Sequence, residues 1–175
     1  MAKTFTWTYQ YSALFGAGSE GSGIDSRVVY GYEAASQTFK KGAPIKIVSG
    51  KLTACVADAV LIATDLFVGF AMQDASGTTN TRLPYSMPAM DGVYKFPVYS
   101  GTSGTATAAT QIGVAYGMYY SSTAGVVVDV AETTASKVMC TIIDIVQDNT
   151  YTLGDTAGLA SVKFNLALRI GMGII

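Results

Sequence analysis

A short apolar run at residues 66–71 constrains this chain to a fold built from buried β-strands. The run, Leu-Phe-Val-Gly-Phe-Ala, follows Asp65 and precedes a turn-rich segment at residues 73–77. Its length, its aromatic and branched side chains and its flanking turn residues favour a strand over a helix. Gly69 inside this strand predicts a point where another backbone passes close, or where a small sheet bends sharply.

A similar pattern, Ile-Gly-Val-Ala, recurs at residues 112–115 and is again followed by turn residues, at 121–125. Two apolar-Gly-apolar-Ala strands predict two similar corners of one small β-barrel. Chance recurrence of four letters in a glycine- and alanine-rich chain is the alternative.

Other segments predict further strands, about nine in all, and no segment predicts a helix of ten residues. Ser49-Gly50 predicts the turn of a hairpin. Pro97 predicts an edge strand or a bulge, and residues 78–90 predict an irregular surface excursion. Apart from residues 66–71 and 112–115, the strands are expected at 28–32, 45–48, 51–56, 93–99, 126–130, 138–146 and 161–170.

The last of these strands alternates most clearly, with its even-numbered residues apolar. These residues are expected to face the core or a permanent interface: Val162, Phe164, Leu166, Leu168 and Ile170. The predicted fold class is therefore all-β, a small β-barrel or β-sandwich of short strands with an extended N-terminal arm and no long helix.

The N-terminal segment carries the candidate partner-binding residues. Residues 4–11 alternate strictly, so that four aromatic side chains share one face of an extended strand: Phe5, Trp7, Tyr9 and Tyr11. Residues 16–23 are a flexible Gly/Ser linker by composition. The segment is either an arm or a first barrel strand followed by a long loop. The predicted organisation is residues 1–23 as strand or arm with linker, and residues 24–175 as a single β domain.

Composition points to a subunit of an assembly. Only 13% of residues are charged, so much of the surface is made of uncharged polar residues and tyrosine, or is covered by partners. The net charge of −1 gives no basic footprint for nucleic acid. No apolar run approaches the ~20 residues that cross a bilayer, and residues 1–7 lack a signal-peptide core. Synthesis in a cytoplasm is expected.

The sequence predicts no enzyme, no metal site and no cofactor. The chain has no histidine, which removes the commonest general base and metal ligand. Its acidic residues follow no ligand spacing. Cys55 and Cys140 are far apart, and a reducing compartment favours two buried thiols over one disulfide. The eleven tyrosines suit a rigid protein interface, with a glycan-binding face as the alternative.

Four motifs follow one another in the middle of the chain: Gly-Ala-Pro-Ile at 42–45, the run at 66–71, Asp-Gly-Val-Tyr-Lys-Phe-Pro at 91–97 and Ile-Gly-Val-Ala at 112–115. In this order they resemble the small β-barrel head-decoration (capsid cement) proteins of tailed bacteriophages. The resemblance covers residues 42–130. The aromatic, Gly-linked N-terminus and the strands of residues 131–175 depart from the family pattern.

The resemblance implies a structural virion protein on the capsid exterior, which binds where capsomers meet and stabilises the shell. Its partners would be the major capsid protein and other copies of itself, as a trimer or dimer, with no nucleic acid, membrane or small-molecule substrate. The rival functions are a small-ligand or glycan-binding barrel and another virion part, such as a tail-tube or head-completion subunit.

Overall fold

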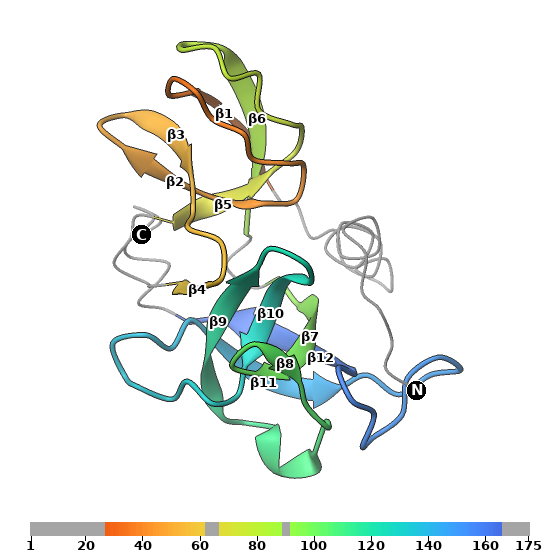
Figure 1. Cartoon of the computed structure of the whole chain (residues 1–175). Coiled ribbons are helices and arrows are strands. Elements are labelled where there is room, and N and C mark those ends of the chain that lie inside the picture. Colours follow the sequence, from red (N-terminus) through yellow and green to blue (C-terminus); the bar gives the residue numbers. More distant parts are fainter. Residues whose placement is uncertain (1–26, 62–66, 89–91, 166–175) are drawn as a thin grey trace.

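The structure is a computed structural model that describes residues 27–61, 67–88 and 92–165. Within these ranges it contains twelve strands and one short 3-10 helix, η1 (Ala109–Gln111). The prediction of an all-β fold without a long helix is confirmed for this part of the chain. The strands form a five-stranded and a seven-stranded sheet, which lie one above the other in Figure 1.

The five-stranded sheet has the order β1-β6-β5-β2-β3. A parallel bridge between Glu33 and Leu52 brings the two ends of this order together, so the sheet curls strongly. Its strands are β1 (Arg27–Tyr32), β2 (Pro44–Val48), β3 (Lys51–Ala54), β5 (Phe67–Ala71) and β6 (Arg82–Met87).

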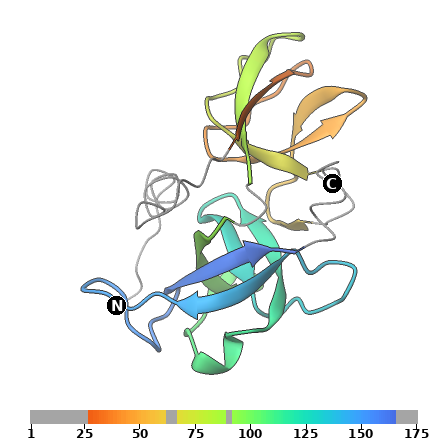
Figure 2. The same ribbon diagram turned by 180° about the vertical axis from the view of Figure 1, so that it is seen from behind.

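The seven-stranded sheet has the order β10-β7-β12-β11-β9-β4, with β8 paired to β7. An additional pairing of β9 with β10 closes five of these strands into a small barrel, which Figure 2 shows from behind. Its strands are β4 (Ala59–Leu61), β7 (Tyr94–Ser100), β8 (Ser103–Gly104), β9 (Ala115–Ser121), β10 (Gly125–Asp129), β11 (Cys140–Ile145) and β12 (Leu159–Phe164).

The predicted hairpin around Ser49-Gly50 is confirmed. β2 and β3 pair antiparallel, with Val48 opposite Lys51. Ser49 and Gly50 have φ angles of 49° and 75°, and positive φ at both central residues is what a two-residue type I′ turn requires.

Gly69 lies where another backbone passes close, as predicted. β5 is buried at every position and lies between β2 and β6. Gly69 has a φ of 151°, and a Cβ at this position would lie 2.1 Å from the Ser86 carbonyl oxygen of β6. Only glycine lets the two backbones approach this closely.

The prediction that residues 112–115 repeat this arrangement is wrong. Ile112 and Gly113 form a turn between η1 and β9, and the strand begins only at Ala115. Gly113 has a φ of 82°, and nothing lies within 4 Å of a Cβ built there. The residue supplies a left-handed turn conformation, not a close approach of backbones.

The prediction of an irregular excursion at residues 78–90 is also wrong, because β6 is an interior strand between β1 and β5. Pro84 fits there since its carbonyl oxygen points toward β5 and accepts a hydrogen bond from Met72 N–H at 3.1 Å. The Pro84 nitrogen also points toward β5, where it lies opposite Met72, the residue that follows the last residue of β5. The missing donor therefore removes only one bond at the end of a ladder.

Pro97 likewise lies in an interior strand, since β7 is flanked by β12 and β10. Its registered partner is Leu159 of β12. Val98 N–H points toward β12 and donates to Gly158, so the Pro97 nitrogen points toward β10. The parallel pairing with β10 begins one residue later, at Val98. The prediction of an edge strand is wrong for this reason.

A cluster of aromatic side chains joins the two sheets into one hydrophobic core. Phe164 of β12 lies 6.4 Å from Phe67 and 6.5 Å from Phe70 of β5, measured between ring centroids. Tyr94 of β7 packs on Phe164 at 5.3 Å. The prediction that Val162 and Phe164 face the core is confirmed. Leu166, Leu168 and Ile170 lie outside the described residues.

Cys55 and Cys140 are both buried thiols, as the sequence favoured. Complete burial raises the pKa of the Cys140 thiol to about 12. A thiol with so high a pKa is protonated and unreactive at neutral pH.

Candidate interaction surface

The four aromatic residues predicted to bind a partner lie outside the described part of the chain. Phe5, Trp7, Tyr9 and Tyr11 all precede Arg27, where the description begins. Their role therefore stays a prediction, and the candidate surface is built from the residues that follow.

β1 carries a row of half-exposed apolar side chains on its outer face. Val28, Tyr30 and Tyr32 are 50%, 53% and 54% exposed. Residues between them face inward: Val29 packs against the core, and a Cβ on Gly31 would lie 2.8 Å from the Leu52 side chain. The alternation of a strand thus places three large apolar side chains in solvent on one face.

Two cationic side chains lie over the tyrosine rings of this row. The Arg82 guanidinium carbon is 4.3 Å from the centroid of the Tyr30 ring, and Lys51 Nζ is 5.6 Å from that of Tyr32. Lys51 Nζ also donates to the side-chain oxygen of Asn80. These contacts fix the rings and add positive charge beside them.

The residues just after β1 show which way its backbone groups point. Glu33 N–H donates to the Thr81 carbonyl, and the Glu33 carbonyl accepts from Asn80 N–H, each at 2.9 Å on the β6 side. Ala34 N–H donates to the Leu52 carbonyl of β3 at 3.0 Å, on the opposite side. Successive residues of a strand point their backbone groups alternately to its two sides. The backbone N–H and C=O groups of odd-numbered residues of β1 therefore point toward β6. Those of even-numbered residues point to the opposite edge of the strand.

Val28, Tyr30 and Tyr32 accordingly direct their N–H and C=O groups to the far edge of β1. Across residues 27–61, 67–88 and 92–165, β1 pairs with β6 alone, and the Glu33–Leu52 bridge lies just beyond its end. Because this bridge brings β3 against the Tyr32 end of the edge, the backbone groups directed toward a further strand are those of Val28 and Tyr30. We call this edge, with the outward side chains of the same three residues, the β1 surface.

The sequence of β1 itself indicates this surface. Residues 28–32, Val-Val-Tyr-Gly-Tyr, predict a strand, but its apolar residues occupy both faces. Gly31 on the inward face and tyrosines on the outward face indicate that the larger side chains lie on the side away from the core. The cations lie far along the chain from their rings, Lys51 by 19 residues from Tyr32 and Arg82 by 52 residues from Tyr30, so periodicity does not indicate them.

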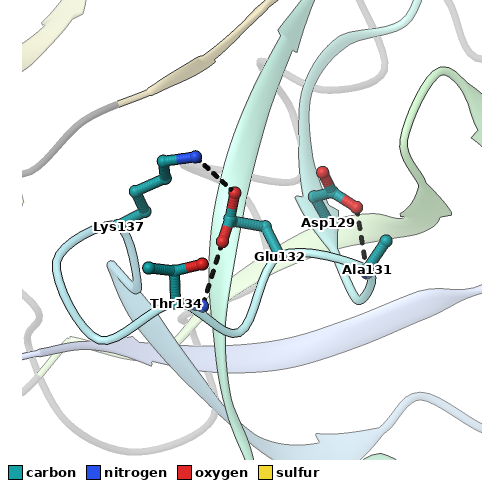
Figure 3. Close-up of polar contacts among 5 residues, drawn as sticks. All are labelled: Asp129, Ala131, Glu132, Thr134 and Lys137. Carbon is teal, nitrogen blue, oxygen red and sulfur yellow. Dashed lines mark hydrogen bonds and ion pairs between the residues drawn. The ribbon is translucent and has the colours of Figure 1, made fainter.

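A second group of polar side chains follows β10 (Figure 3). Glu132 Oε1 accepts from Thr134 N–H at 2.9 Å, and its Oε2 contacts Lys137 Nζ at 3.0 Å. Hydrogen bonds from the Thr134 hydroxyl and amide, and from Lys137, lower the pKa of Glu132 from 4.5 to about 2. Asp129 accepts from Ala131 N–H at 3.0 Å. Glu132 is bound within its own loop, whereas Asp129 also accepts from Gly101 N–H at 2.8 Å, so the group shapes the turn after β10 and joins it to the turn between β7 and β8.

Glu33 is a fully buried carboxylate that also acts on a loop. Its two oxygens accept from Ser76 N–H at 3.1 Å, from the Ser76 hydroxyl at 2.6 Å and from Gly77 N–H at 2.7 Å. These donors satisfy the buried charge. Glu33 thereby holds the connection from β5 to β6 against the end of β1.

Among the residues the structure describes, no three His, Cys, Asp or Glu side chains come together in a way that holds a metal ion. The described part of the chain contains no helix with the length and apolar character of a membrane span. The sequence matches no protein-family model and no curated protein.

Proposed function

We propose that this chain is a structural, non-enzymatic protein that binds the outer surface of a tailed-phage capsid where capsomers meet and stabilises the shell. The four ordered motifs of residues 42–130 support the family, and the barrel of β7, β9, β10, β11 and β12 is compatible with it. The observation that carries an interaction role is the β1 surface: an edge strand with three half-exposed apolar side chains.

The partner is the major capsid protein of the same particle, and copies of the chain also contact one another as a dimer or trimer. The contact residues on the N-terminal side are Phe5, Trp7, Tyr9 and Tyr11. Tyrosine, tryptophan and arginine carry much of the energy of protein interfaces because they bury a large rigid area with a polar end. Tyr30, Tyr32 and Arg82 are residues of these kinds, and Arg82 lies over the Tyr30 ring.

Co-sedimentation with purified shells that lack this protein tests the proposal. The variant Trp7→Thr/Tyr9→Thr keeps strand-forming side chains but removes two aromatic rings. We expect its affinity for shells to fall at least about tenfold, because each large interface aromatic contributes about 2 kcal/mol. A matched control is Val56→Ser, which truncates an exposed apolar residue away from the β1 surface.

Unchanged shell binding by Trp7→Thr/Tyr9→Thr would contradict the role of the N-terminal aromatic residues. Absence of binding by the wild-type chain would contradict the capsid proposal itself. Localisation of the chain to the tail tube or to the head-completion complex would support the other virion functions.

A glycan-binding role is the second candidate, favoured by Tyr30 and Tyr32 on one exposed face with cations beside them. Aromatic faces stack on sugar rings, and the cations would select acidic sugars. Calorimetric titration with neutral and acidic oligosaccharides separates the two functions. Saturable binding that is lost in Tyr30→Ser/Tyr32→Ser would support the glycan-binding role.

A further inference from the structure

Charge is distributed unevenly between the two sheets. The strands of the five-stranded sheet contain four of the chain's eleven basic residues and none of its twelve acidic residues. The four are Arg27, Lys46, Lys51 and Arg82. The strands of the seven-stranded sheet contain two residues of each sign, and the chain as a whole has a net charge of −1. Positive charge is therefore concentrated on the strands of the five-stranded sheet.

Two of these cations meet on the β1 surface, at the end where the sheet curls closed. Arg82 lies opposite Tyr32 in the pairing of β6 with β1, and its guanidinium carbon is 4.3 Å from the centroid of the Tyr30 ring. The parallel bridge just beyond β1 brings β3 to the same end. Lys51, the first residue of β3, places its Nζ 5.6 Å from the centroid of the Tyr32 ring. Three strands thus bring two cations and two half-exposed rings together.

Neither cation is paired with a carboxylate of residues 27–61, 67–88 or 92–165. Glu33, which follows β1 directly, is fully buried, and its oxygens accept hydrogen bonds from the connection between β5 and β6. The exposed carboxylate of Asp74 in that connection is paired with Lys40 at 2.9 Å. The positive charge on the β1 surface is therefore open to the carboxylates of a partner.

The grouping of cations with tyrosine rings favours a protein ligand. A guanidinium binds a carboxylate through two parallel hydrogen bonds, and arginine next to an aromatic ring combines this contact with apolar area. Arg82 lies over one face of the Tyr30 ring, so a sugar ring cannot stack on that face. Carboxylate side chains interspersed with apolar ones on a protein surface match both the cations and the rings.

We propose that the β1 surface binds an acidic region of a partner protein. Carboxylates of that region contact Lys51 and Arg82, while its apolar side chains pack on Val28, Tyr30 and Tyr32. The inference rests on the proposed function, because it specifies the chemistry of the capsid-protein surface that this chain binds. The contact is made by side chains and needs no additional strand.

Titration of the isolated full-length chain with an acidic peptide, followed by NMR, tests the ligand chemistry without any shell. The probe is a capped Glu-Ala-Glu-Ala-Glu peptide, and its matched neutral peptide has glutamine in place of each glutamate. We expect the amide signals of Tyr30, Tyr32, Lys51 and Arg82 to shift to saturation with the acidic peptide alone. Raising the ionic strength from about 0.01 M to about 1 M shortens the Debye length about tenfold and is expected to weaken this binding at least about tenfold.

The variant Lys51→Gln/Arg82→Gln removes both cations and keeps polar side chains of similar length. We expect its affinity for the acidic peptide to fall at least about tenfold, because hydrogen bonds to charged groups are lost. Lys95→Gln/Lys163→Gln is the matched control, since it makes the same change in net charge on strands of the seven-stranded sheet. The control is expected to behave as wild type, both with the peptide and in co-sedimentation with shells.

Three results would overturn the inference. They are absent or equal shifts with the two peptides, an equal loss of affinity in the two double variants, and an acidic oligosaccharide that saturates the same signals at a lower concentration than the peptide. The last result would make a glycan the ligand. Binding of the acidic peptide at the β1 surface by a wild-type chain that does not bind shells would support the acidic specificity and contradict the capsid proposal, so the two fail separately.

Discussion

Replacing Gly69 with alanine tests the backbone packing at the centre of the five-stranded sheet. The alanine Cβ would lie 2.1 Å from the Ser86 carbonyl oxygen and 2.9 Å from the Ser86 carbonyl carbon. Both are backbone atoms of β6, which is paired on both sides and cannot turn away as a flexible side chain does. The substitution therefore forces β5 and β6 apart.

Two effects add to the expected loss of stability. Forcing extra volume into a packed core costs about 1–3 kcal/mol. A non-glycine residue at the φ of 151° costs a further ~1–3 kcal/mol. The expected destabilisation is about 4 kcal/mol, which lowers the Tm of a chain of this size by about 8–16 °C.

Gly113→Ala is the matched control, because the two glycines lie in the same four-residue pattern. Gly113 has a φ of 82° with nothing within 4 Å of the added Cβ, so only backbone strain of about 1 kcal/mol is expected. Differential scanning calorimetry of both variants gives the comparison. Equal losses of Tm in the two variants would refute the reasoning that a close backbone approach sets the requirement at Gly69.

Three further substitutions probe other parts of the molecule. Glu33→Gln places a side-chain NH2 group against the N–H donors of Ser76 and Gly77. Urea titration is expected to show that the free energy of unfolding falls by about 2–3 kcal/mol. A loss smaller than that of a variant at an exposed site would contradict this expectation. Phe164→Ala opens the aromatic cluster between the sheets, with an expected loss of about 3–5 kcal/mol by the same titration. The pKa of Glu132 is lowered from 4.5 to about 2, so the stability that its carboxylate contributes is present above pH 4.5 and is lost as the pH falls toward 2. The Tm difference between wild type and Glu132→Gln should therefore shrink across that window. A constant difference would argue against the hydrogen-bonded carboxylate.

Local sequence patterns were sufficient for elements whose geometry is set by their own residues. Ser49-Gly50 specified a two-residue turn because both positions adopt positive φ. The alternation of Val162 and Phe164 specified the buried face of β12, since side chains of a strand alternate between its faces. In both cases the determining interaction lies within a few residues.

Patterns failed where the determining partner is distant in sequence. Gly69 and Gly113 share a local pattern, but only Gly69 meets the backbone of another strand, 17 residues away at Ser86. Pro84 and Pro97 suggested a loop and an edge, yet the missing N–H of Pro84 falls at the end of a ladder and that of Pro97 falls just before one. The β1 surface was missed for the same reason, because exposure of Tyr30 depends on how the sheet curls.

Electron cryomicroscopy of particles assembled with and without this chain tests the proposed capsid role most directly. The proposal predicts additional density on the outer surface where capsomers meet, into which the two-sheet fold fits with the β1 surface and the N-terminal aromatic residues at the contact. Identical shells in the two reconstructions, or density for the chain only in the tail or at the portal, would contradict it.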